Sequence, residues 1–198
     1  MVRARDDRRH ATGAPAAATP ALTVHVVPMR RRHLRAVLRI EAETHPRPWS
    51  LSLFMSEMAL RSSRAYYVAR VEGLVVGYVG LMTSGDEAHV TTIAVDPNWH
   101  RRKIGTRLLL VAARDAIRRG ATALTLEVRM SNRGAQEMYR RFGFRPAGVR
   151  KNYYVETNED ALIMWAEDVN LPEYAARLDA IEAAVPGHTI VDPGGRPL

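Results

Sequence analysis

Glu127 is the first residue whose type and setting suit acid–base chemistry. It lies in a run, residues 123–129, in which apolar and polar side chains alternate as they do in a strand with two different faces. A strand covered on both faces partly desolvates such a carboxylate, which raises its proton affinity and suits it to act as a general base. The alternative is a surface glutamate paired with Arg129.

Tyr139 is the second candidate. It falls in a predicted short helix, on the same face as Asn132 and Gln136, whereas Met138 and Phe142 fall on another face. A phenol beside a bound thioester could donate a proton to the departing thiolate. The alternative is a tyrosine that only packs in the core.

Three cations, Arg101, Arg102 and Lys103, crowd the predicted start of a long amphipathic helix. The N-terminus of a helix carries partial positive charge, so each unpaired cation there costs a few tenths of a kcal/mol. A bound anion reverses the sign, because free backbone N–H groups and the cations converge on it and Gly105 lets it approach closely. The turn is therefore either a pyrophosphate cradle or a solvated basic turn.

Aromatic residues in two loops are candidates for substrate contacts. Trp49 ends the loop 45–49, and Tyr153 and Tyr154 lie side by side near the end of the chain's last strands. Loops with exposed aromatic residues often bind ligands or peptides. The alternative is that these side chains anchor the packing.

The elements that position these residues follow from periodicity and turn signals. The expected order is β-α-α-β-β-β-α-β-α-β-β. The strand–helix–strand unit in its middle predicts a parallel pair, and the hairpins around it predict antiparallel neighbours, so we expect a mixed sheet. The expected strands are 22–27, 65–71, 74–83, 88–95, 123–129, 148–155 and 160–166; the expected helices are 31–43, 50–60, one from 102 or 103 with the core stripe Ile104, Leu108, Val111 and Ala112, a short one up to about 142, and one after 170 with Tyr174, Leu178 and Ile181.

Composition narrows the class of partner. The chain has 29 Lys and Arg against 21 Asp and Glu, a net charge of +8, which favours nucleotide phosphates, RNA, ribosomes or acidic peptides. The absence of cysteine excludes disulfides, thiolate metal sites and a cysteine nucleophile, and the seven histidines show no metal-ligand spacing. The longest nearly apolar run, residues 74–82, is far shorter than the roughly 20 residues of a membrane span, and no signal peptide is evident, so we expect a cytoplasmic protein.

Taken together, these stretches resemble the GNAT superfamily of N-acetyltransferases over about residues 23–166. More narrowly they resemble its bacterial RimI branch, which acetylates the N-terminal alanine of ribosomal protein S18. The matching text lies at residues 92–97, 105–109, 126–132, 138–144, 150–154 and 160–164.

The resemblance implies an α/β (α+β) GNAT fold. Its central sheet would be mixed and mostly antiparallel, with about six or seven strands, a parallel splay between the fourth and fifth, and about four flanking helices. Residues 21–168 would form this domain, after a disordered, basic, Ala- and Pro-rich tail (1–20) and before a C-terminal extension (169–198) with one amphipathic helix.

The resemblance also implies direct transfer from acetyl-CoA, as co-substrate and without a metal, to a protein N-terminal α-amine. Glu127 would be the general base and Tyr139 the general acid. Trp49, Tyr153 and Tyr154 would frame the peptide. The residues implied to hold acetyl-CoA are Ile93, Ala94, Val95, Arg101, Arg102, Lys103, Ile104, Gly105, Thr106 and Asn132.

One departure from the family pattern concerns the pyrophosphate turn, which usually reads Gln/Arg-x-x-Gly-x-Gly/Ala. His100 stands at its first position and Lys103 at its first glycine. A lysine can still donate its backbone N–H there if its backbone is helical. Two other functions stay open: a GNAT enzyme that acetylates lysine side chains or a small amine, and a basic ribosome- or RNA-binding module with a vestigial CoA site.

Overall fold

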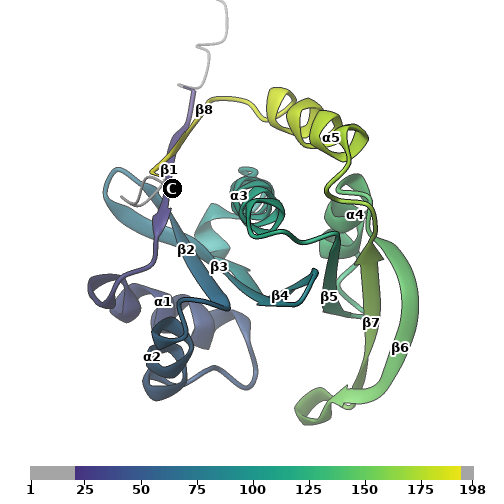
Figure 1. Ribbon diagram of the computed structural model, residues 1–198. Coiled ribbons are helices and arrows are strands. Elements are labelled where there is room, and N and C mark those ends of the chain that lie inside the picture. Colours follow the sequence, from purple (N-terminus) through teal and green to yellow (C-terminus); the bar gives the residue numbers. More distant parts are fainter. Residues whose placement is uncertain (1–20, 193–198) are drawn as a thin grey trace, which may run out of the picture.

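The computed structural model describes residues 21–192, which form three layers: one sheet with helices on each of its two faces (Figure 1). The tail expected at residues 1–20 and the last six residues of the extension lie outside this range. The strands are β1 (Thr23–Pro28), β2 (Arg64–Val71), β3 (Leu74–Ser84), β4 (Glu87–Val95), β5 (Ala123–Arg129), β6 (Arg145–Tyr154), β7 (Glu159–Ala166) and β8 (His188–Val191). The helices are α1 (Leu34–Thr44), α2 (Leu51–Ala59), α3 (Ile104–Arg118), α4 (Arg133–Arg141) and α5 (Pro172–Ala183), with short 3-10 turns at Arg31–His33, Pro97–Trp99 and Val155–Thr157.

Local sequence signals explain where several elements begin and end. The hydroxyl of Ser50 accepts a hydrogen bond from the Leu53 N–H and caps α2; of the two serines at the start of this helix, Ser50 and Ser52, the first is the cap. Glu72 and Gly73 both have positive φ, 49° and 85°, which closes the predicted tight hairpin between β2 and β3. The predicted elements are therefore confirmed, with ends that differ by a few residues.

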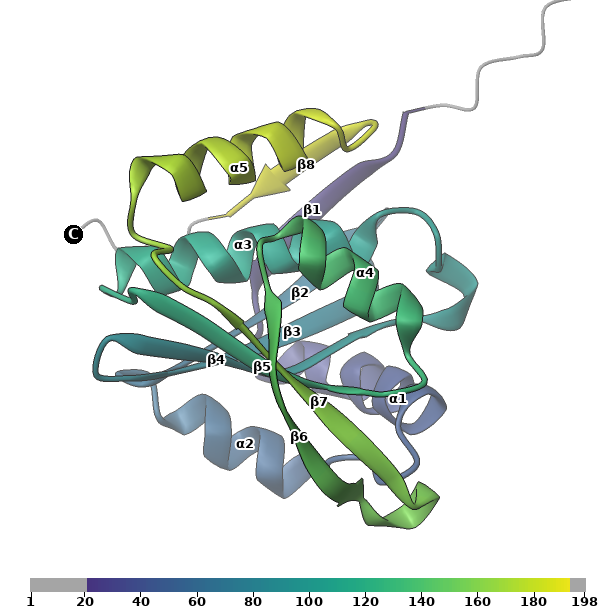
Figure 2. The ribbon, with the colours of Figure 1, turned by 90° about the vertical axis from the view of Figure 1, so that its right-hand side faces the viewer.

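Two apolar clusters fix the layers, one on each face of the sheet (Figure 2). The predicted stripe of α3 is fully buried, with Ile104, Leu108 and Ala112 at most 1% exposed, and packs on the sheet together with α4 and α5. On the other face, Phe54 of α2 packs against Tyr66 and Tyr78. Each fully buried apolar side chain of this size contributes about 1.5–3 kcal/mol of transfer free energy.

The sheet runs in the order β6-β7-β5-β4-β3-β2-β1-β8. It is mixed, because β4 pairs with β5 and β1 with β8 in parallel, whereas the other five neighbouring pairs are antiparallel. The parallel pair β4–β5 and the mostly antiparallel remainder are as predicted.

Within residues 21–192 the five α-helices are the four expected in the domain and the one expected in the extension, whereas the sheet has eight strands, one more than predicted. The unpredicted strand is β8, only four residues long and directly preceded by Pro186 and Gly187. So short a run between turn residues has no periodicity to detect. It becomes a strand because β1 offers it a free edge.

A β-bulge in β4 changes which side chains face α3. Val90 pairs with Leu81 and Thr92 with Gly80, so Thr91 is the extra residue. Before the bulge Val90 belongs to the cluster around α3; after it Ile93 packs against that cluster, although strict alternation would have turned it to the other face. A side chain at Gly80 would collide with the Tyr66 ring and come within 2.7 Å of Thr91 Oγ1, so the bulge requires glycine there.

Within residues 21–192, no helix is both long and apolar enough to cross a membrane. The same residues contain no group of three or more His, Asp or Glu side chains placed to hold a metal ion.

Candidate active site

The centre of the candidate site is the gap between β4 and β5. The two strands pair only at their first residues, from Glu87 opposite Ala123 to His89 opposite Thr125. Beyond that point β4 continues along β3 and β5 continues along β7. The edges at 90–95 and 126–129 therefore diverge, and the backbone groups along them that neither β3, β7 nor a side chain engages can pair with a ligand. The predicted residues Ile93, Ala94 and Val95 form the β4 wall of this gap.

Glu127 lies on β5 beside the point where the strands diverge, on the face opposite Leu126 and Val128. Its side chain is 11% exposed. Its Oε2 atom lies 3.0 Å from Nε2 of His89, and its Oε1 atom lies 3.1 Å from Nε of Arg150. The carboxylate is thus half-enclosed between an imidazole and a guanidinium.

Two sequence-based expectations for Glu127 are wrong. It does not pair with Arg129, which instead pairs with Glu156 and Glu159, at 3.1 Å in each case. Its proton affinity is not raised either: the hydrogen bond from His89 lowers the pKa of Glu127, and together with the charges of His89 and Arg150 it outweighs the effect of burial. The sequence showed that the strand was enclosed but not which side chains faced the carboxylate.

Tyr139 lies on α4 with 4% exposure, and its ring centroid lies 5.8 Å from that of Phe144. Burial, with a smaller effect from Tyr154, raises the pKa of Tyr139. The phenol therefore stays protonated at neutral pH. Tyr139 is a core residue, as one alternative expected, and this burial also gives it the protonation state that a proton donor needs.

Tyr154 connects the two candidate catalytic residues. Its ring lies under the Arg129 guanidinium, 3.8 Å from the carbon of that group, and 5.1 Å from the ring of Tyr153. Burial raises the pKa of Tyr154 to about 12, and the charge of Glu127 adds to this rise. Tyr154 in turn adds to the raised pKa of Tyr139. Tyr153 is 46% exposed and Tyr154 is half-buried, so the two tyrosines of the pair differ in their exposure to solvent.

Trp49 is positioned by a buried carboxylate. Its ring lies 5.3 Å from that of Phe54, and its backbone N–H donates to Glu41 Oε1 at 2.9 Å. Glu41 is 1% exposed and also accepts a hydrogen bond from the Tyr78 hydroxyl. Trp49 therefore anchors its loop by packing, and the structure does not bring it into contact with Glu127 or Tyr139.

The basic turn before α3 has an unusual backbone. Arg101 and Lys103 both adopt left-handed conformations, with φ of 62° and 61°. The condition of a right-handed helical backbone at Lys103 is therefore not met, and its conformation is the one that glycine adopts most easily. Arg101, Arg102 and Lys103 are all exposed, and Arg102 stacks on the ring of Trp99 at 4.8 Å.

The first turn of α3 presents free donors beside these cations. The N–H groups of Ile104, Gly105 and Thr106 precede the first intrahelical bond, from Arg107 N–H to the Lys103 carbonyl. Gly105 faces Val95 and Met138, and a side chain there would meet Met138 Sδ at 3.4 Å. The turn thus places donors, cations and the end of β4 together, an arrangement that suits a pyrophosphate.

Asn132 has a structural role that sequence reasoning missed. It is the N-cap of α4, and its Oδ1 atom accepts a hydrogen bond from the Ala135 N–H at 3.1 Å. Gln136 on the same face is buried and donates to the carbonyl oxygens of Arg129 and Met130. Together they fix α4, and with it Tyr139, to the end of β5.

His89 and Arg150 are site residues that the sequence did not single out, and His100 makes a contact that it did not predict. His100 Nε2 lies 2.9 Å from the carbonyl oxygen of Val95, at the edge of the gap. Alternation along residues 87–90 indicates that His89 shares a face with neither Ala88 nor Val90. Its approach to Glu127, however, depends on the register between two strands, which one sequence does not reveal.

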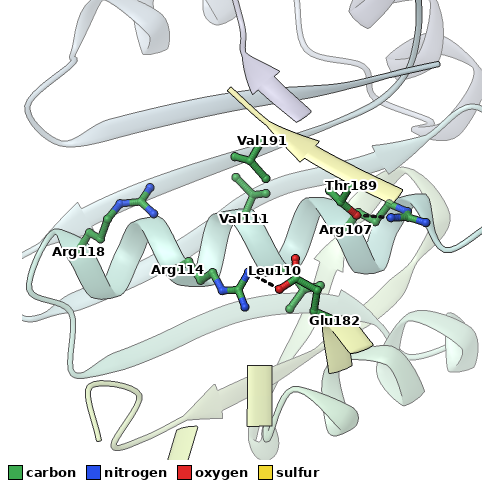
Figure 3. Close-up of a pocket in the computed structure, with 8 residues that line it drawn as sticks. All are labelled: Arg107, Leu110, Val111, Arg114, Arg118, Glu182, Thr189 and Val191. Atoms are coloured by element: carbon green, nitrogen blue, oxygen red, sulfur yellow. Dashed lines mark hydrogen bonds and ion pairs between the residues drawn. The ribbon is translucent and has the colours of Figure 1, made fainter. Parts of the chain in front are cut away.

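A separate cavity of about 230 Å³ lies away from this site, between α3, α5 and β8 (Figure 3). Arg107, which is 1% exposed, lines it and donates hydrogen bonds to Thr189 and to the Pro186 carbonyl. Arg114 pairs across it with Glu182 at 2.8 Å. The cavity thus lies in the joint that attaches the last helix and strand to α3.

Comparison with known proteins identifies the class. Residues 34–144 match the model of the acetyltransferase (GNAT) family. The chain belongs to this family, and it is an N-acetyltransferase.

The names of its relatives describe a narrower activity than the family model does. The Escherichia coli (strain K12) [ribosomal protein bS18]-alanine N-acetyltransferase is 36% identical over 133 residues, which cover 66% of this chain and 88% of the relative. The N-alpha-acetyltransferase RimI of Mycobacterium tuberculosis is 40% identical over 122 residues, 59% of this chain and 74% of the relative. The crystal structure of the E. coli ribosomal-protein-S18-alanine N-acetyltransferase matches with a TM-score of 0.67 at 32% identity, over 73% of this chain and 94% of that one. The chain therefore resembles RimI-type enzymes in sequence and in fold.

Proposed function

We propose that this protein transfers an acetyl group from acetyl-CoA to a protein N-terminal α-amine, and that its acceptor is the N-terminal alanine of ribosomal protein S18. The assignment of this acceptor rests on the 36% identity with the E. coli enzyme named for that reaction, over most of that enzyme's length. GNAT enzymes use acetyl-CoA as acetyl donor.

The residues present fit acetyl-CoA. The diverging edges of β4 and β5 offer backbone groups to an extended amide-bearing arm, and the free N–H groups and cations before α3 suit its pyrophosphate. Ile93, Ala94 and Val95 would hold the arm, the turn at 101–106 the pyrophosphate, and Asn132 would contribute its amide NH2 group. When bound, acetyl-CoA supplies the activated acyl group as a thioester.

Two side chains of this protein, Glu127 and Tyr139, transfer protons in the proposed reaction. Glu127 is ionised at neutral pH, because its pKa is lowered, and it accepts the proton that the substrate amine loses as it attacks the thioester carbonyl. Arg150 occupies one carboxylate oxygen, and its side chain is 55% exposed, so it can move aside for the amine. Tyr139 keeps its phenolic proton and donates it to the departing sulfur.

The acceptor's chemistry is compatible with a weak base. An α-amine has a reference pKa of about 7.7–8.0, so a sizeable fraction is neutral at physiological pH, whereas a lysine amine near 10.4 is almost entirely protonated. Tyr153 and Tyr154 would frame the entering peptide, and the Trp49 loop would form the opposite wall. The net charge of +8 favours an acceptor presented beside RNA phosphates, and hence a reaction in the cytoplasm at or near ribosomal particles.

A peptide panel tests the proposal. The purified protein is given acetyl-CoA with a peptide that begins Ala-Arg, with the same peptide blocked at its N-terminus, with a blocked peptide containing lysine, or with a polyamine, and thiol release is measured. We expect turnover with the free Ala peptide and none with its blocked form. Turnover only with lysine or polyamine would replace the acceptor. Glu127→Gln should lower kcat at neutral pH with little change in acetyl-CoA affinity.

A further inference from the structure

His89 lies in direct contact with the candidate general base, although the reaction proposed above gives it no part. Its Nε2 atom lies 3.0 Å from Oε2 of Glu127, and its Nδ1 atom lies 2.7 Å from Oγ1 of Thr125. Both ring nitrogens are therefore engaged on one line from Glu127 to Thr125. The side chain of His89 is 26% exposed, against 11% for Glu127, so the histidine lies nearer to solvent.

The strand register builds this contact. His89 pairs with Thr125 in the last rung before β4 and β5 diverge, and the two side chains share a face. Glu127 lies two residues further along β5 on that face. The imidazole therefore lies at the narrow end of the gap.

Thr125 allows His89 to hold a proton on either nitrogen. A threonine hydroxyl can donate to a bare ring nitrogen or accept from a protonated one. Neutral His89 can therefore donate from Nε2 to the Glu127 carboxylate, or present a bare Nε2 to a protonated Glu127 while Nδ1–H donates to Thr125. Both tautomers and the imidazolium form are satisfied by the same two partners.

Glu127 is the charged group in direct contact with His89. From β5 the uncharged Thr125 and the carboxylate of Glu127 face His89, and β6 contributes Arg150 on the far side of that carboxylate. Beside His89, β3 places the uncharged Met82, and α3 covers the opposite face of the sheet. Charged groups of α1 and α2 are engaged elsewhere: Glu41 by Trp49 and Tyr78, and Glu57 by Arg64 and Tyr66.

We propose that His89 is the second member of a proton relay, in which Glu127 takes the proton from the substrate amine and passes it to His89, which returns it to solvent. In the first step an N–H bond of the attacking amine breaks and a Glu127 O–H bond forms. In the second, His89 is the neutral tautomer with its hydrogen on Nδ1, which Thr125 accepts; the Glu127 O–H bond breaks and an Nε2–H bond forms, which leaves an imidazolium between the Glu127 carboxylate and the Thr125 hydroxyl. Water then takes the proton.

This inference rests on the proposed function, because Glu127 must be the first acceptor. The relay explains how Glu127 can serve as the first proton acceptor although it binds a proton weakly. A carboxylate held between His89 and Arg150 binds a proton weakly, and its lowered pKa expresses the same fact. Histidine is the side chain whose reference pKa lies between pH 5 and 8, which suits it to take up and release a proton in each turnover.

The test compares His89→Gln, His89→Ala and Glu127→Gln, with His25→Gln, an exposed histidine on β1, as the matched control. Glutamine keeps a hydrogen-bond donor to Glu127 but cannot accept the proton. We expect His89→Gln to lower kcat by about 10-fold or more. Its Kd for acetyl-CoA and its KM for the Ala peptide should stay within about twofold, and His25→Gln should match the unmodified protein.

Added imidazole provides a second readout that a purely structural role would not move. His89→Ala leaves room beside Glu127, so imidazole in the buffer should restore part of its kcat in a saturable way. The double variant with Glu127→Gln should not respond. Thr125→Val, which removes the Nδ1 partner and not the histidine, should lower kcat less than His89→Gln and tests the same relay if the histidine variants fold poorly.

The outcomes separate the two claims. Full activity of His89→Gln with an inactive Glu127→Gln would overturn the relay and leave Glu127 as sole base. Activity in His89→Gln but not in His89→Ala, without imidazole rescue, would make His89 only a support for Glu127. Full activity in Glu127→Gln would overturn the general base itself, and the relay with it.

Discussion

The Nε2 atom of His100 lies 2.9 Å from the carbonyl oxygen of Val95, the last residue of β4. Because a carbonyl oxygen only accepts, Nε2 must carry the hydrogen. The residue at the first position of the pyrophosphate turn thus holds the end of the strand that forms one wall of the gap. The turn and the wall are joined before any ligand binds.

His100→Ala should therefore weaken acetyl-CoA binding. A net hydrogen bond contributes about 0.5–1.5 kcal/mol, which corresponds to roughly a 2- to 12-fold increase in Kd by calorimetry. His100→Gln, whose amide can still donate to Val95, serves as the control and should bind within about twofold of the unmodified protein. Equal affinity of both variants would show that the contact does not prepare the site.

Lys103→Gly should make the protein more stable but bind acetyl-CoA less tightly. Lys103 has φ of 61°, a conformation that costs a side-chain-bearing residue about 1–2 kcal/mol, whereas glycine adopts it freely. Glycine also gives the unfolded chain more freedom, which costs about 0.4–1 kcal/mol, so we expect a net gain of up to about 1.5 kcal/mol in urea unfolding.

Lys103→Ala separates the two effects, since it removes the same charge without relieving the backbone. Both variants should bind acetyl-CoA more weakly and lose part of the salt dependence of that binding. Only Lys103→Gly should gain stability. A Lys103→Ala protein as stable as Lys103→Gly would mean that the left-handed backbone carries no cost here.

Tyr139→Phe should lower kcat by roughly 10²-fold while the melting temperature changes little, because the ring still packs against Phe144. Burial raises the pKa of Tyr139, so its ionisation should not limit kcat below about pH 10. The sign for stability follows: the contribution of a raised pKa is fully present below the unfolded value near 10 and is lost as pH rises through the folded value. An alkaline fall in kcat that starts below pH 9 and disappears in Tyr139→Phe would contradict this assignment.

Asp96 should make the protein sensitive to acid. Burial raises its pKa, but hydrogen bonds from Arg39, at 2.6 Å, and from the Asn98 N–H outweigh burial and lower it. Its stabilisation is therefore present above the unfolded pKa of about 3.9 and is lost as pH falls through the lower, folded value. Asp96→Ala should cost about 1.5–3 kcal/mol in urea at pH 7 and remove part of the acid transition.

Glu43 provides the control for Asp96, because it pairs with the same arginine at 3.1 Å and is 41% exposed. Glu43→Ala should change the free energy of unfolding by no more than about 0.5 kcal/mol. Equal losses in the two variants would mean that the buried contact of Arg39 is worth no more than its exposed one.

Much of the fold followed from local patterns. The α3 stripe, the Ser50 cap and the tight turn at Glu72 and Gly73 are short-range features, and a single sequence displays them. β8 did not follow, because four residues become a strand only beside the free edge of β1. The bulge at Thr91 escaped prediction for the same reason, since it exists only relative to the register of β3.

The sequence alone determined the family and the candidates: alternation placed Glu127 on one face of a strand, and helical spacing placed Tyr139 on the face of its helix that Asn132 and Gln136 share. Tertiary structure alone decided what surrounds Glu127. His89 and Arg150 come from other strands, and their approach depends on register and on where β4 leaves β5. Proton affinity is set by charges within a few ångströms of the group, and those distances exist only in the folded chain. Enclosure in a strand was expected to raise the proton affinity of Glu127, but its neighbours lower it.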